Sequence, residues 1–102
     1  MLFLIYWELN EQVAASQRIA ALNKMQAAGL FPPPDAEIIR FDITPGQWGS
    51  TVMEADSSGA IMRHLGAWRI ACPGIFVTTK VSPAMSVADS VAEMMDVLKK
   101  LD

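Results

Sequence analysis

The first seven residues form an apolar run that contains no charge and no turn-forming residue, which predicts a buried β-strand. Side chains alternate between the two faces of a strand. One face would carry Leu2, Leu4 and Tyr6, and the other Phe3, Ile5 and Trp7. Both faces are therefore apolar and both need a cover. A chain this short can cover one face with its own helices, so we expect a second subunit or a bound ligand on the other.

Residues 12–28 contain no Gly or Pro and place apolar side chains at helical spacing, which predicts a helix. Asn10 is a suitable N-cap because its side-chain oxygen can accept a hydrogen bond from a free amide of the first turn. Gly29 is a suitable residue to end the helix. The three prolines of 32–34 then predict a stiff connector that holds Leu30 and Phe31 against the core. A proline ligand for an aromatic groove is the alternative.

Residues 37–43 alternate in polarity, which predicts a half-polar strand. Ile39, Phe41 and Ile43 would share one side, opposite Ile38, Arg40 and Asp42. Residues 44–49 are rich in turn formers and residues 50–55 resemble a returning strand, so the two strands are predicted to form a hairpin. Trp48 would lie near the tip of this hairpin.

A second helix is predicted after the possible N-caps of 56–58, with Ile61, Leu65 and Trp68 as its core stripe. Residues 75–81 are β-branched and aromatic, which predicts a fourth strand, closed by Pro83. Ser86 and Asp89 resemble a capping box that opens a last helix. Its apolar stripe would consist of Val87, Val91, Met94, Leu98 and Leu101.

The predicted order β-α-β-β-α-β, followed by one more helix, is typical of a ferredoxin-like α+β fold with a four-stranded antiparallel sheet. We expect a single domain over residues 1–102. Hydrophobic residues make up 52% of the chain and charged residues 19%, which favours a globular protein with apolar surface to bury in an interface. The net charge is −3 and no basic cluster occurs, which argues against nucleic acid and an anionic membrane surface as partners.

The chain has a single cysteine, Cys72, and a single histidine, His64, so it can form neither an intrachain disulfide nor a Cys/His zinc site alone. We therefore expect no metal and no fixed cofactor. The amino terminus lacks the basic segment and cleavage site of a signal peptide, and we expect a cytoplasmic protein. Cys72 precedes a proline and is expected to be a small buried hydrophobe.

Several polar residues are expected on the sheet face that the helices leave open. If Phe41 and its neighbours face the helices, the opposite face carries Arg40, Asp42, Glu54, Thr78 and Lys80 beside Tyr6 or Trp7. Such groups could orient an anionic or carbonyl substrate, with Glu54 or Asp42 as a base. The alternative is that they form solvated or interface salt bridges, which contribute little.

Two further residues are candidates for a ligand site. His64 lies off the apolar stripe of the second helix, which predicts a surface or rim position. A role as general base or haem ligand stays open because its pKa lies near neutrality. Trp48, flanked by glycines, could cap a partner subunit or the mouth of a pocket.

The chain resembles the dimeric α/β-barrel superfamily of small ferredoxin-like proteins, and within it an uncharacterised bacterial family of single-domain proteins. The resemblance rests on the first strand ending in Trp7, the proline-rich connector, Gly49 leading into a strand that ends at 54–56, Trp68, and the Val-Ser-Pro exit at 81–83. It implies the strand order 4-1-3-2 and a homodimer whose sheets pack face to face, with Phe3, Ile5 and Trp7 or their alternates against the partner.

Members of this superfamily include cofactor-independent monooxygenases, lactone isomerases, haem enzymes and regulatory domains that bind small molecules, so the fold alone does not decide the function. We expect a homodimer that binds a small organic molecule on the open sheet face without a fixed cofactor. The alternatives are a cofactor-independent enzyme of the monooxygenase or isomerase type, and a structural or interaction module.

Overall fold

The computed structural model describes residues 1–102 and contains four strands and three helices. In chain order they are β1 (Leu2–Leu9), α1 (Ala15–Ala27), β2 (Ala36–Ile43), β3 (Trp48–Ala55), α2 (Ser58–Ala71), β4 (Phe76–Ala84) and α3 (Val87–Leu101). The strands form one antiparallel sheet in the order β2-β3-β1-β4. The predicted ferredoxin-like α+β fold with an additional C-terminal helix is confirmed, and β1 and β3 are its central strands.

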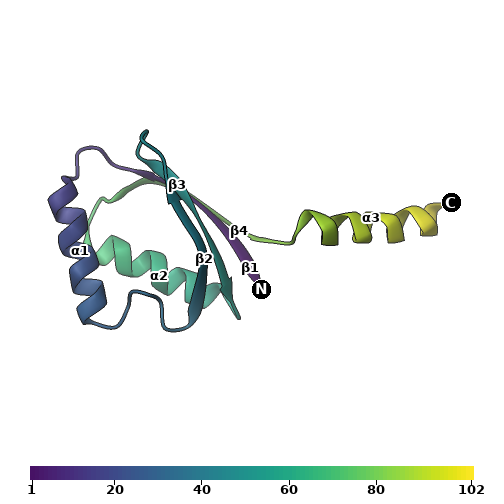
Figure 1. Ribbon diagram of the computed structural model, residues 1–102, viewed down its shortest axis with the longest axis horizontal. Coiled ribbons are helices and arrows are strands. Elements are labelled where there is room, and N and C mark those ends of the chain that lie inside the picture. The colour runs from purple at the N-terminus through teal and green to yellow at the C-terminus, as the bar shows by residue number, and fades with distance from the viewer.

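Both α1 and α2 lie on the same side of the sheet, whereas α3 projects away from the body beyond the end of β4 (Figure 1). The opposite side, here called the open face, is covered by no element of the chain (Figure 1). No helix combines the length and the apolar character that are needed to cross a membrane.

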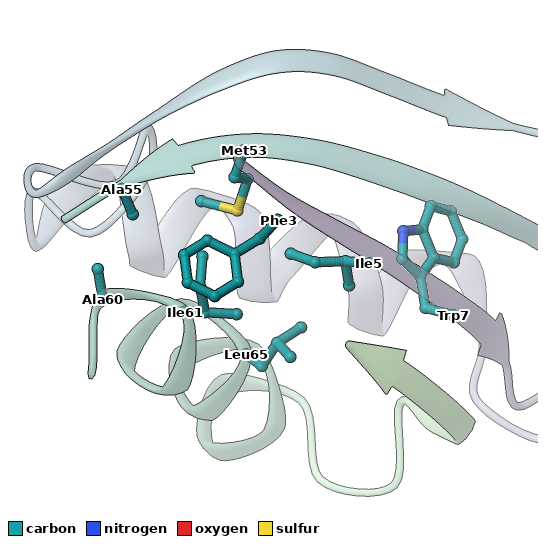
Figure 2. Packing of buried hydrophobic residues seen from close by; sticks show 8 residues of the cluster. All are labelled: Phe3, Ile5, Trp7, Met53, Ala55, Ala60, Ile61 and Leu65. Carbon is teal, nitrogen blue, oxygen red and sulfur yellow. The ribbon is translucent and has the colours of Figure 1, made fainter. Parts of the chain in front are cut away.

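The main core lies between the central strands and α2. Phe3 and Ile5 of β1 and Met53 of β3 point toward Ile61 and Leu65 of α2 (Figure 2). All five side chains are buried. The alternation of β1 is thereby resolved: Phe3, Ile5 and Trp7 face the helices, so Leu2, Leu4 and Tyr6 are the set on the open face.

Strand β2 contains a bulge that shifts the predicted alternation at its start. Ile38 lies opposite Met53 and Arg40 lies opposite Val52, so Ile39 is an extra residue between them. The prediction that Ile39 shares a side with Phe41 and Ile43, opposite Ile38, was wrong: Ile38 packs against the core and Ile39 is exposed. After the bulge the pattern holds, with Phe41 on the helix side and Arg40 on the open face.

Several predicted boundaries also need correction. Helix α1 begins at Ala15 rather than residue 12. The side chain of Asn10 accepts a hydrogen bond from the amide of Gln12, so it forms a local turn instead of capping α1. At the other end Gly29 has a positive φ of 72°, as expected for a residue that terminates a helix.

In the second half of the chain, Trp48 belongs to β3 rather than to the preceding turn, and β4 continues across Pro83 to Ala84. Proline is tolerated there because β4 is an edge strand, where an absent amide donor costs little. Two predicted helix starts are confirmed: Ser57 is the N-cap of α2, and Ser86 caps α3 by accepting a hydrogen bond from the Asp89 amide.

Candidate functional site

A cavity of about 420 Å³ lies between the sheet and the two helices that cover it. Strands β1, β2, β3 and β4 and helices α1 and α2 all contribute to its wall. Ten of the thirteen lining residues are hydrophobic, which makes the cavity suited to an apolar molecule. The lining residues are Trp7, Leu9, Arg18, Ile19, Leu22, Phe41, Ile43, Thr51, His64, Leu65, Trp68, Ile75 and Phe76.

Aromatic rings build much of this wall. The Trp7 and Phe41 rings meet edge to face, with their centroids 5.8 Å apart. Phe31, from the proline-rich connector, does not line the cavity but contacts two residues that do: its ring centroid lies 6.0 Å from that of Trp68 and 6.1 Å from that of His64. The connector therefore holds Phe31 against the body as predicted, although Leu30 remains 43% exposed.

Two of the three polar residues in the wall already have hydrogen-bond partners. The Trp7 indole N–H donates to the Thr51 hydroxyl at 3.0 Å, in a buried position. The Arg18 guanidinium donates to the side-chain oxygen of Gln47 at 2.9 Å. These hydrogen bonds hold the Thr51 and Arg18 side chains in place. The Arg18 guanidinium still has further N–H groups that can donate.

His64 is the exception, and its predicted surface or rim position was wrong. The side chain is only 5% exposed, and its Nδ1 atom has no hydrogen-bond partner. It lies one residue before Leu65, on the part of α2 that turns toward the sheet, together with Ala60 and Ile61. A buried nitrogen without a partner is costly, and the His64 residue also lines the cavity.

Burial lowers the pKa of His64 from its ordinary value of 6.5, and the negative charge of Asp35 opposes this effect in part. Asp35 itself is held by Arg63, whose hydrogen bond is the main reason why the pKa of that carboxyl is lowered. The imidazole is therefore neutral at pH 7. A neutral imidazole offers one N–H donor and one lone pair to a ligand.

The buried imidazole predicts a pH dependence of stability. Below pH 6.5 the unfolded chain takes up a proton at His64 that the folded chain resists, so the free energy of unfolding falls with falling pH. The slope contributed by one such group is at most about 1.4 kcal/mol per pH unit. Urea unfolding between pH 7.5 and 5 measures it. We expect this slope to flatten in His64→Phe, and an unchanged slope would contradict the assignment.

The other predicted site residues lie on the open face, away from this cavity. The sheet register places Tyr6, Arg40, Asp42, Trp48, Glu54, Thr78 and Lys80 there. This cavity is thus on the opposite side of the sheet from the pocket that the open-face residues were predicted to line. Of the nine candidates only Trp7 and His64 line it.

The charged groups on the open face pair with near neighbours. Arg40 and Asp42 form an exposed ion pair at 2.6 Å, and Glu54 binds the amino terminus. The Tyr6 hydroxyl donates to Glu8, and this hydrogen bond is the main reason why the pKa of Tyr6 is raised. These contacts favour the salt-bridge alternative, while a ligand-binding role of these residues stays a prediction.

A second hollow of about 500 Å³ lies beside Trp48 at the end of the β2–β3 hairpin. Only three of its nine lining residues are hydrophobic, and polar side chains such as Glu8, Asn10 and Gln47 form most of its wall. The few apolar groups give little surface that a small organic molecule could bury. We therefore regard the cavity between sheet and helices as the candidate site.

Sequence reasoning did not single out Arg18, Phe41 or Thr51 as site residues. Arg18 belongs to the polar side of the predicted first helix, and Thr51 is one β-branched residue among several in a strand. Phe41 faces the helices, an orientation that the sequence left open, and core and cavity residues share that orientation. No local signal in the sequence distinguishes a wall of a cavity from a packed core.

No curated protein matches this chain. A family model does, and it covers residues 1–100, nearly the whole chain. The match therefore includes every element that forms the cavity, together with α3 apart from its last residue. The chain belongs to the family described as a domain of unknown function, DUF3303.

Proposed function

We propose that this protein binds a small, largely apolar organic molecule in the cavity between the sheet and helices α1 and α2. The observation that carries the proposal is a cavity of about 420 Å³ whose wall is mostly apolar and includes three polar side chains, those of Arg18, Thr51 and His64. Known ligand pockets of about 300–1,000 Å³ combine an apolar wall with a few polar groups in the same way. The aromatic wall favours a flat ligand with one hydroxyl or carbonyl group near His64.

The proposal includes a homodimer in which each chain's open sheet face is covered by the second copy. Its support is apolar surface that the chain itself leaves uncovered: Leu4 is 49% exposed and Trp48 is 46% exposed on this face. Large apolar side chains gathered on one surface are typical of an interface. The dimer and the ligand cavity use opposite faces of the sheet, so each can be tested separately.

Titration with 2-naphthol, a flat molecule with one hydroxyl, tests the ligand site. The three tryptophan indole N–H signals in a ¹H–¹⁵N NMR spectrum serve as reporters. Trp7 and Trp68 line the cavity and Trp48 does not. We expect saturable shifts of the Trp7 and Trp68 signals and none of the Trp48 signal. Naphthalene, which lacks the hydroxyl, should bind more weakly.

A matched pair of substitutions controls this titration. Leu22→Phe enlarges a side chain in the cavity wall and should weaken naphthol binding about tenfold, which is the loss of roughly 1.4 kcal/mol. Ile70→Phe makes a similar change at a position that is 83% exposed outside the cavity, and should leave binding unchanged. Equal affinity in both variants, or a shift at Trp48 alone, would refute the cavity as the site.

A second candidate function is a cofactor-independent enzyme of the monooxygenase or isomerase type. The observation that favours it is again His64, because a neutral imidazole in the cavity wall can accept a proton from a bound substrate. The test is to add a bound molecule to the unaltered protein and to His64→Gln, and to analyse what each releases. If the unaltered protein releases it chemically changed and His64→Gln releases it unchanged, the protein is an enzyme and not only a binding protein.

A further inference from the structure

Helix α3 has a wide apolar side that nothing in the chain covers. No residue of α3 is buried, and seven large apolar side chains on it are between 44% and 81% exposed. Val91, Met94 and Leu98 lie at the centre of this apolar side, and Met95 and Val97 widen it. The charged residues, among them Glu93 and Asp96, occupy the opposite side of the helix.

The width of this apolar side indicates what kind of surface it fits. At 3.6 residues per turn, the positions from Val97 to Met95 span an arc of about 160° around the helix axis. A two-stranded coiled coil buries a narrow seam, whereas a helix that lies on a broad surface such as a sheet buries an arc wider than about 100°. The pattern of α3 therefore favours a sheet face over a single neighbouring helix.

The helix does not reach the open face of its own sheet. β4 leads out past the start of β1, where Ala84 lies opposite Leu2, and α3 continues away from the body (Figure 1). The Ser86 cap starts α3 only two residues after the strand ends, so the connection between them is short. The radius of gyration is 16.6 Å, compared with about 13 Å for a compact domain of this length.

The open face of a second copy matches α3 in length and has an apolar strip along its centre. α3 has 15 residues and is about 22 Å long, and the eight residues of β1 span about 26 Å. Leu4, Tyr6 and Val52 form an apolar strip along the two central strands of that face. Each copy thus has one unpartnered helix and one uncovered sheet face, and a two-fold dimer can satisfy both at once.

The exposed area is also of the size that a stable dimer needs. The exposed parts of the seven apolar residues present on the order of 700 Å², while each partner in a standard interface contributes about 800 Å². The largest apolar patch of an ordinary monomer is about 300–600 Å². An exchange of two helices doubles the contribution of α3, which brings the contact into the range of stable homodimers.

We propose that α3 is an exchanged arm, which packs its apolar side across the open sheet face of a second copy of this chain. The inference rests on the proposed homodimer and deepens it by naming the element that each copy places on the other. It does not depend on the small-molecule cavity, which lies on the other side of the sheet.

Substitutions in α3 test the arm without disturbing the α/β body, because no residue of α3 is buried. Met94→Glu and Leu98→Glu place a charge on the apolar side. Sedimentation equilibrium should show a dimer dissociation constant raised about tenfold or more, with unchanged naphthol binding. The matched control Ala92→Glu adds the same charge on the polar side and should change the constant by less than about threefold. Equal constants in all three variants would overturn the proposal.

Cysteine cross-linking identifies what α3 contacts. A chain carrying Leu4→Cys on the open face is mixed with a chain carrying Met94→Cys, and the mixture is oxidised. The proposal predicts a disulfide between the two chains, and no such product when Ile70→Cys replaces Leu4→Cys. A disulfide formed only within a doubly substituted chain at high dilution would show that α3 folds onto its own sheet, and would overturn the exchange.

Two other outcomes separate the arm from the proposed dimer. If Leu4→Cys chains cross-link to each other and not to Met94→Cys chains, the sheets pack directly, so the dimer stands and the exchanged arm is wrong. If the unaltered protein sediments as a folded monomer at micromolar concentration, both the arm and the homodimer are wrong. The naphthol titration remains a separate test of the cavity in either case.

Discussion

Replacement of Gly49 by alanine is expected to destabilise the protein by about 3 kcal/mol, at the upper end of the usual cost of overpacking. A Cβ atom at this position would lie 2.1 Å from the carbonyl oxygen of Asp42 and 2.6 Å from ring carbons of Trp7. The first contact is with the backbone of the paired strand β2, and the second is with a buried ring. Neither group can move without breaking strand pairing or core packing, so the steric clash cannot be relieved without a large loss of stability.

Gly66→Ala is the matched control for this prediction, and it should have the opposite sign. Gly66 lies inside α2 with no atom within 4 Å of the position where a Cβ would be built. Alanine at an open helix position should stabilise the protein by about 1 kcal/mol. Urea unfolding at one fixed protein concentration measures both variants, because dimer formation makes stability depend on concentration. Equal stability of the two variants would contradict the close approach at Gly49.

Phe3→Ala is the second substitution with a large expected effect, a loss of about 3–5 kcal/mol in the free energy of unfolding. The Phe3 side chain is 2% exposed and lies between the sheet and α2, next to Ile61 (Figure 2). Its removal leaves a cavity at the centre of the main core. Thermal or urea unfolding of the variant gives the value directly.

The control for Phe3→Ala is Ile70→Ala, at a position on α2 that is 83% exposed. This change should cost less than about 0.5 kcal/mol, as is usual for surface substitutions. A loss below about 1.5 kcal/mol for Phe3→Ala would mean that Phe3 is not buried in the folded protein, and that β1 has the opposite face toward the helices.

The order of strands and helices could be predicted because their periodicities are strong and local. The apolar run of 1–7 and the glycine-free segment of 12–28 each specify one kind of element, and the short turns between later elements leave few possible topologies. The bulge at Ile39 could not be predicted in this way. It arises from pairing between β2 and β3, and two adjacent isoleucines give no local sign of which one faces the core.

The candidate site was harder to predict than the fold. The polar residues expected on the open face lie there, but they pair with each other or remain at the surface, as Arg40 and Asp42 do. His64 was expected at the surface because its position falls beside the stripe of Ile61 and Leu65. In the structure a wider part of the α2 surface is buried, including His64, and the Phe31 ring lies against the imidazole. That arrangement depends on contacts between distant segments.

The last helix also has a property that its sequence pattern could not predict. Its cap at Ser86 and its apolar stripe were both predicted, and the cap is confirmed. The stripe alone does not tell whether the helix packs on its own chain. Its direction in space depends on where β4 ends relative to β1, which only the folded arrangement defines.

Native mass spectrometry of the protein isolated from its own host tests the proposed ligand cavity most directly. Masses under conditions that preserve complexes are compared with masses under denaturing conditions, for the unaltered protein, Leu22→Phe and Ile70→Phe. We predict a dimer with a discrete extra mass that is released on denaturation, is retained in Ile70→Phe and is lost in Leu22→Phe. An extra mass that persists equally in Leu22→Phe, or none in any of the three proteins, would contradict a small-molecule site between the sheet and the helices.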